Sequence, residues 1–162
     1  MVRLIGAVLV AAGGAALGFQ AAAGLGRRVR ALTEMAEGLA LLERELELNA
    51  PPLSRLLACG AARSRGPAEA LFRECLRGLN NLDREDFSTL WRRLVSGCVS
   101  LGSEGQAVLA PLGDALGRYD EERQREALAA VRRRLEEDSR RRGRVYQALG
   151  LSGGAFLVIL LL

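Results

Sequence analysis

The side chains of this sequence that could do chemistry are three cysteines and a run of glutamates. Cys59, Cys75 and Cys98 are odd in number and far apart, and no Cys-x-x-Cys pair occurs. A zinc site or a disulfide framework requires closer pairing or an even number of cysteines. Each cysteine lies among leucines, alanines or valines, so we expect small apolar core residues that are free thiols in a reducing compartment.

The glutamates Glu43, Glu45 and Glu47 could hold a metal ion if their carboxylates converged on one point. On a helix their spacing distributes them around the axis instead, which predicts a solvated face. The sequence therefore indicates no metal site among these carboxylates.

Histidine and lysine are absent from the sequence, and all 23 cationic side chains are arginine. Without lysine there is no Walker A phosphate loop and no Schiff-base nucleophile. Without histidine there is no serine–histidine or cysteine–histidine dyad and no histidine-bearing zinc site. We expect no enzyme, no catalytic residue and no cofactor, and only carboxylate and arginine chemistry remains as a catalytic alternative.

An apolar segment at each end of the chain sets its organisation. Residues 4–25 and residues 145–162 contain no charged side chain. Helices of these lengths are about 33 and 27 Å long, close to the thickness of the hydrocarbon core of a bilayer. We predict a transmembrane anchor over residues 1–26 and a membrane-spanning segment over residues 145–162. A cleaved signal peptide at the N-terminus and a C-terminal tail docked on its own domain are the alternatives.

Arginines flank both apolar segments on the sides that face the middle of the chain. Since cationic flanks stay in the cytoplasm, both termini are predicted to lie outside and residues 27–144 inside. The membrane-flanking residues are Arg27, Arg28, Arg30, Arg140, Arg141, Arg142 and Arg144.

The basic excess of the chain lies beside the second apolar segment. Residues 118–144 contain ten arginines and seven acidic residues, whereas the charges balance over residues 27–117. Such an excess favours membrane lipid with anionic headgroups as a partner. Because no aromatic residues are interleaved with the arginines to stack on bases, we expect no nucleic-acid partner, and nothing indicates a small-molecule substrate.

The middle of the chain repeats apolar residues at the helical period, and no stretch alternates as a β-strand does. We predict an all-α fold, an antiparallel bundle of about six helices over residues 27–144 between the two membrane segments. Its expected core includes Leu32, Met35, Leu39, Leu42, Leu46, Phe72, Phe87 and Trp91.

Turn residues predict where these helices end. Pro51 and Pro52 end the first bundle helix, a Ser-Arg-Gly turn at residues 64–66 ends the second, and residues 80–83 form another turn. Pro111 predicts a kink or a late start in the fifth helix. Asp120 is expected to cap the last helix. That helix should continue as a solvated rod, because residues 136–144 contain no large apolar side chain that could enter the core.

Several short motifs resemble stage III sporulation protein AB of endospore-forming bacteria. They include LLEREL at residues 41–46, Pro52-Leu53, Gly66-Pro67 and Leu71-Phe72. The most specific is LGDALGRYD at residues 112–120, followed by Gln124, which is similar to the family signature LGxxLGxxD…Q. The resemblance covers nearly the whole chain.

This resemblance implies a function that composition does not. The family belongs to a membrane complex between mother cell and forespore, and its cytoplasmic domain is similar to platform-protein domains of type II secretion and type IV pilus systems. It implies a non-catalytic platform subunit in the mother-cell membrane around the forespore, with its bundle in the cytoplasm. The implied partners are stage III sporulation protein AA, an ATPase, and other membrane proteins of the same complex, and a homo-oligomer is compatible with it. The alternative is a helical coiled-coil membrane adaptor unrelated to sporulation.

The signature residues form the candidate partner-binding site. They are Gly113, Leu116, Gly117, Asp120 and Gln124. Two glycines four residues apart present a strip without side chains, which lets another backbone approach closely. Internal helix packing, with Asp120 only a cap, is the other interpretation.

Overall fold

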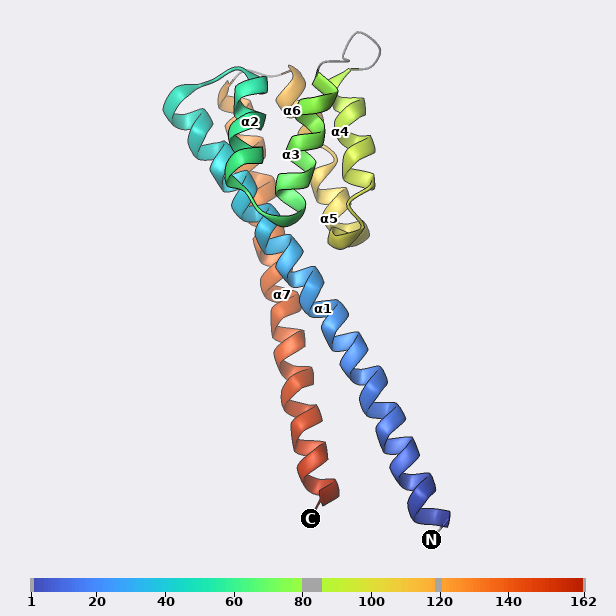
Figure 1. The fold of residues 1–162 in the computed structure, drawn as a ribbon. Helices are drawn as coiled ribbons and strands as arrows, with labels where there is room; N and C mark the ends of the chain where they lie inside the picture. Colours follow the sequence, from blue (N-terminus) through green and yellow to red (C-terminus); the bar gives the residue numbers. More distant parts are fainter. Residues whose placement is uncertain (1, 80–85, 119–120, 162) are drawn as a thin grey trace.

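The computed structural model describes the backbone of residues 2–79, 86–118 and 121–161, and the side chains of residues 23–79, 86–116 and 122–145. Every regular element in these ranges is a helix, which confirms the all-α prediction. Two helices are much longer than the others: α1 (Val2–Asn49) has 48 residues and α7 (Glu121–Leu161) has 41. They pack together and run antiparallel, so both termini lie at the same end of the molecule (Figure 1).

Shorter helices form the bundle around the half of this pair that lies away from the termini (Figure 1). They are α2 (Leu53–Arg63), α3 (Gly66–Leu79), α4 (Phe87–Ser96), the 3₁₀ helix η1 (Val99–Leu101), α5 (Gly102–Leu109) and α6 (Leu112–Arg118). α2 and α3 form a hairpin that packs on α1, and α4 packs on α3 and α6. α5 and α6 close the bundle against α7.

The helix ends follow from individual residues. Ala50, after α1, has a φ of 40°, and the two prolines that follow it cannot continue a helix. Gly66 opens α3 with a φ of 56°, a left-handed conformation that favours glycine. Pro111 lies between the end of α5 and the start of α6, so it divides the fifth predicted helix into two.

The core runs continuously through the bundle. The predicted apolar face of α1 is buried at Leu32, Met35, Leu39, Leu42 and Leu46. Phe72 and Trp91 are fully buried, and Phe87 packs on Trp91 with ring centroids 6.1 Å apart. The aromatic residues are therefore core residues, as their helical spacing predicts.

The predicted anchor and the first bundle helix are parts of one continuous helix, α1. One expectation about the long helices needs correction. The prediction that residues 136–144 contribute nothing to the interior is wrong for Ser139, which is 9% exposed and hydrogen-bonded to Thr33 on α1. One face of the α7 rod is thus packed on α1 rather than solvated. The predicted turn at residues 80–83 and the cap at Asp120 lie outside the described residues.

The predicted membrane segments form the ends of α1 and α7. Up to residue 22 and from residue 146 onward, their side chains lie outside the described residues. In the part of the chain whose side chains are described, no helix is sufficiently long and apolar to cross a membrane.

Candidate functional site

The predicted partner site lies where α6 meets α7, at the end of the bundle away from the termini (Figure 1). Gly113 on α6 is buried against Trp91 on α4. A β-carbon on Gly113 would lie 2.7 Å from the Cδ1 atom of the Trp91 ring. That distance is shorter than any normal carbon–carbon contact, so a larger residue would displace the indole. Gly113 therefore permits the close approach of α4 and α6.

Trp91 also joins these helices through its polar atom. Its Nε1 donates a hydrogen bond of 2.9 Å to the carbonyl oxygen of Leu109, the last residue of α5. Carbonyls in the last turn of a helix lack partners within the helix, and Pro111 ends α5 at this point. The indole thus donates to a carbonyl oxygen that has no partner within α5, and it connects α4, α5 and α6.

Two further signature residues connect α6 to α7. Leu116 is 2% exposed, and its carbonyl oxygen accepts a hydrogen bond of 3.4 Å from Gln124 Nε2 on α7. Gly117 lies within α6, but its surroundings and Asp120 lie outside the described residues. The structure thus places Gly113 in the contact between α4 and α6 and joins Leu116 to Gln124 between α6 and α7, as the packing interpretation requires.

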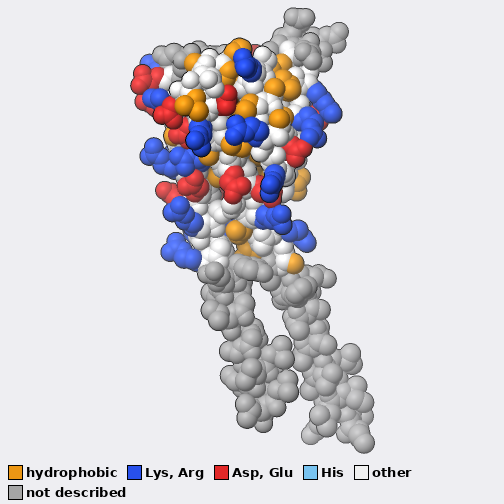
Figure 2. Space-filling model, turned by 60° about the vertical axis from the view of Figure 1, so that its left-hand side comes forward, with side chains coloured by type: hydrophobic (Ala, Val, Ile, Leu, Met, Phe, Trp, Pro, Cys, Tyr) orange, Lys and Arg blue, Asp and Glu red, His pale blue; other side chains and the backbone are white. Residues whose placement is uncertain are grey.

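The membrane-flanking arginines lie at one level of the α1–α7 pair. Thr33 Oγ1 and Ser139 Oγ are 2.8 Å apart, which sets the register of the antiparallel helices. Each helix rises about 1.5 Å per residue, and Arg28 precedes Thr33 by the same number of residues by which Arg144 follows Ser139. Arg28 and Arg144 are therefore level with each other. The arginine cluster, as we call it, consists of Arg27, Arg28, Arg30, Arg140, Arg141, Arg142 and Arg144. Figure 2 shows arginines on both helices at the lower end of the described surface.

Two members of the arginine cluster turn toward the bundle. Arg28 Nε donates a hydrogen bond of 3.3 Å to the carbonyl oxygen of Leu101 in η1. Arg142 on α7 pairs with Asp138 at 3.2 Å and also with Glu104 on α5. These side chains fasten η1 and α5 to the long helices, a role that their charge alone did not predict.

The other members point into solvent. Arg30 is paired with Glu34 at 2.9 Å, and Arg140 with Glu136 at 3.7 Å, but their side chains are 82% and 77% exposed. Exposed pairs of this kind contribute little to stability and are readily exchanged for other partners. The remaining exposed members are Arg27, Arg141 and Arg144.

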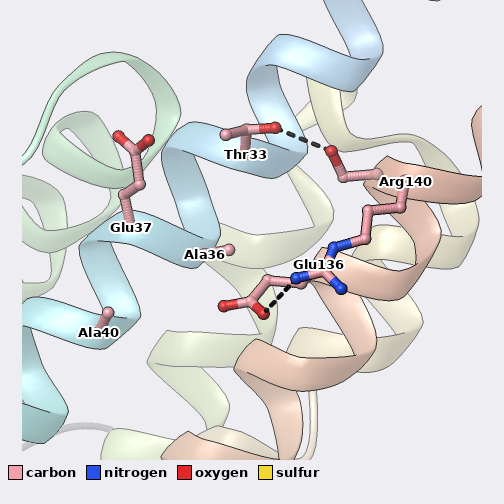
Figure 3. A pocket seen from close by; sticks show the side chains of 7 residues that line it. Thr33, Ala36, Glu37, Ala40, Glu136 and Arg140 are labelled. Atoms are coloured by element: carbon pink, nitrogen blue, oxygen red, sulfur yellow. Dashed lines mark hydrogen bonds and ion pairs between the residues drawn. The ribbon is translucent and has the colours of Figure 1, made fainter. Parts of the chain in front are cut away.

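A shallow pocket of about 340 Å³ lies between α1 and α7. In Figure 3, Glu136 and Arg140 point toward one another on the α7 side, and the hydroxyls of Thr33 and Ser139 are bonded to each other. Ala36 and Ala40 supply small apolar surface from α1. The polar groups that line the pocket are thus largely engaged with one another. Within the described ranges, no three potential ligands from His, Cys, Asp and Glu lie close enough together to hold a metal ion.

The cysteines are free thiols in the structure. Cys75 is buried, and burial, aided by the nearby Cys98 and Glu74, raises the pKa of its thiol to about 12. Burial also raises the pKa of Cys98. Since the reactive form is the thiolate, the Cys75 thiol is a core group and not a nucleophile at neutral pH.

Comparison with known proteins decides the family. The sequence profile of stage III sporulation protein AB (spore_III_AB) matches residues 3–162. The chain belongs to this family. Membership confirms the resemblance found in the sequence and disfavours an adaptor unrelated to sporulation.

A solved structure described as "Stage III sporulation protein AB (SpoIIIAB)" is similar in fold, with a TM-score of 0.64 and 19% sequence identity. The similarity covers 75% of this chain and 97% of that chain. At this identity, the structural likeness supports the fold alone. No curated protein matches the sequence.

Sequence reasoning missed the polar contacts between the long helices of this family member. Besides the Thr33–Ser139 pair, Arg132 on α7 binds Glu43 on α1 at 2.9 Å. Hydrogen bonds that Arg132 donates to the carboxylates of Glu43 and Glu136 raise the pKa of Arg132 above its usual value. A signal for Ser139 existed, because the buried positions Leu128, Val131 and Leu135 continue at helical spacing to residue 139.

Proposed function

We propose that this protein is a non-catalytic, membrane-anchored platform subunit of the sporulation complex between mother cell and forespore. Its bundle lies in the mother-cell cytoplasm, and both termini lie on the other side of the membrane. The observation that carries this proposal is the common level of the arginine cluster on α1 and α7.

The geometry of α1 and α7 supports a hairpin in a single bilayer. Both helices continue beyond the arginine cluster at the same end of the molecule (Figure 1). Since Arg28 and Arg144 are level, the apolar segments beyond them begin within about 3 Å of the same level. One bilayer surface can therefore meet both cationic flanks, as the charge rule requires of two flanks that stay in the cytoplasm.

The proposed partner is a secretion-type ATPase, stage III sporulation protein AA, bound at the far end of the bundle. This partner class follows from the family's similarity to the platform proteins of secretion systems. The far end is opposite the termini (Figure 1) and thus projects farthest from the membrane in the proposed arrangement. Because Gly113 and Leu116 are buried, the contact uses exposed side chains beside them, such as the Arg92–Asp114 ion pair at 2.7 Å.

Cysteine labelling in intact cells tests the membrane arrangement. Val2, Ser100 and Leu162 are replaced singly by cysteine in a chain whose native cysteines have been removed. An impermeant maleimide should label positions 2 and 162 and leave position 100 unlabelled, because only the bundle lies in the cytoplasm. Permeabilised cells, in which all positions react, are the control. Labelling at position 100 but not at position 2 would contradict the proposal.

Co-purification of the full-length protein with the ATPase tests the partner contact. Arg92→Glu should abolish co-purification, whereas Arg133→Glu, an equally drastic change at an exposed position of α7, should not. The double variant Arg92→Glu/Asp114→Arg keeps an ion pair within the chain and should still fail to bind. Undiminished binding by Arg92→Glu would refute the contact at this end.

A further inference from the structure

Large apolar side chains are exposed at three positions of the described chain: Leu48, Val99 and Val145, which are 68%, 82% and 51% exposed. Leu48 lies near the end of α1 that is farthest from the termini. Val99 is in η1, at the turn between α4 and α5, and Val145 is on α7 directly after the arginine cluster. Val145 therefore lies at the level at which the apolar end of α7 begins.

The contacts of the arginine cluster hold the Val99 turn at this level. Arg28 binds the carbonyl oxygen of Leu101, and its guanidinium lies so close over Gly102 that it leaves no room for a β-carbon there. Arg142 reaches the start of α5 from the other long helix, where it pairs with Glu104. The turn is thus fastened to both long helices beside the predicted membrane surface.

The distance along the axis of α1 between Arg28, which holds the turn, and the apolar segment is short. The apolar segment of α1 ends at residue 25, which is about 4.5 Å from Arg28 along the helix axis. The headgroup layer on each side of a bilayer is about 5–8 Å thick. If residues 4–25 span the bilayer core, the backbone of Arg28 falls within the headgroup layer, and the turn lies within the reach of the Arg28 side chain that holds it.

We infer that the α4–α5 turn is a third membrane contact, in which Val99 inserts among the lipid headgroups. The exposed arginines Arg27, Arg141 and Arg144 bind the phosphates of anionic lipids around it, since guanidinium groups form charge-assisted hydrogen bonds with phosphate. This inference rests on the proposed membrane arrangement. Three points of contact, one on each long helix and one on the bundle, fix the orientation of the bundle on the membrane.

Tryptophan fluorescence tests the contact in the full-length protein, reconstituted into vesicles of phosphatidylcholine and phosphatidylglycerol. Val99→Trp places a reporter in the turn, and Leu48→Trp is the matched control, because it replaces an exposed apolar residue at the opposite end of the bundle. The emission of the buried native Trp91 is subtracted by using the unmodified protein. With brominated lipids, the Val99→Trp signal should be shifted to the blue and lose most of its intensity, and the Leu48→Trp signal should lose almost none.

Equal quenching of the two variants would overturn the inference, as would an unquenched Val99→Trp signal in protein that remains embedded. Extraction at alkaline pH separates this outcome from failure of the proposed function. If the protein leaves the vesicles at alkaline pH, the predicted anchoring itself is wrong. Substituting phosphatidylcholine for all of the phosphatidylglycerol should reduce the quenching of Val99→Trp, and a constant value would exclude the role of the arginines.

Discussion

The two halves of the α1–α7 pair differ in the balance of their apolar and polar contacts, although the far half also contains the Arg132–Glu43 ion pair and the near half the buried Leu32. Far from the termini, α1 buries Met35, Leu39 and Leu42 against α7 and the short helices, and all are 0% exposed. Near the arginine cluster, the contacts are polar: Thr33 with Ser139, Arg28 with Leu101 and Arg142 with Glu104. Apolar burial is non-directional, whereas hydrogen bonds depend on distance and angle. The far half thus supplies most of the stability, and the near half fixes the register of the helices and the position of the α4–α5 turn.

The largest loss of stability is expected from removing the aromatic centre of the far half. Trp91→Ala should lower the free energy of unfolding by about 3–5 kcal/mol, because it leaves a cavity and orphans the carbonyl of Leu109. Urea denaturation of the full-length protein in detergent micelles, followed by circular dichroism, measures the change. A loss below about 1 kcal/mol would show that Trp91 is not a core residue in solution.

A smaller loss is expected from filling the space beside Trp91. Gly113→Leu should lower the free energy of unfolding by about 1–3 kcal/mol, since its side chain collides with the indole. Gly143→Ala is the control in the near half, because a β-carbon there meets nothing within 4 Å. In the same denaturation assay, that control should leave the protein as stable or up to about 1 kcal/mol more stable, owing to the higher helix propensity of alanine. A Gly113→Leu protein of normal stability that no longer binds the ATPase would instead support the partner interpretation of this residue.

The smallest effect is expected in the near half. Thr33→Val should lower the free energy of unfolding by about 1 kcal/mol, because it leaves the buried hydroxyl of Ser139 without its partner. Ser139→Ala should cost less, because the Thr33 hydroxyl keeps its hydrogen bond to the carbonyl oxygen of Val29. The double variant should cost less than the sum, since neither hydroxyl then remains. A double-mutant cycle by urea denaturation gives the coupling energy. Strict additivity would mean that the hydroxyls do not bind each other in solution, and the near half would lose its proposed role in setting the register.

The sequence predicted the far half well and the near half poorly, for a physical reason. Leucines at helical spacing, as from Leu32 to Leu46, indicate a buried face before any partner helix is known. The turns at Pro51 and Gly66 were predictable because proline and glycine restrict or free the backbone locally. The contacts of Arg28 and Arg142 depend on residues more than 35 positions away in the chain, and charge alone predicts only that such side chains face solvent.

For the candidate site, too, the sequence predicted local features but not the tertiary contacts. The signature at residues 112–120 indicated that the α6–α7 junction matters, but not whether its glycines face inward or outward. That choice depends on Trp91, whose ring occupies the space beside Gly113. Pro111 predicted a disturbance in the fifth helix, but the donor that satisfies the broken end of α5 comes from another helix. Tertiary contacts of this kind leave no periodic pattern in the sequence.

The continuity of the long helices has a mechanical consequence. No proline lies in α1 from Val2 to Asn49 or in α7 from Glu121 to Leu161. Sharp bends in helices occur mainly at prolines and at Gly/Ser pairs, and neither occurs in residues 27–49 of α1 or in residues 121–144 of α7. These stretches are therefore stiff rods that reach from the arginine cluster into the packed core. If the proposed partner applies a torque to the far end of the bundle, both rods tilt together at the level of the arginine cluster.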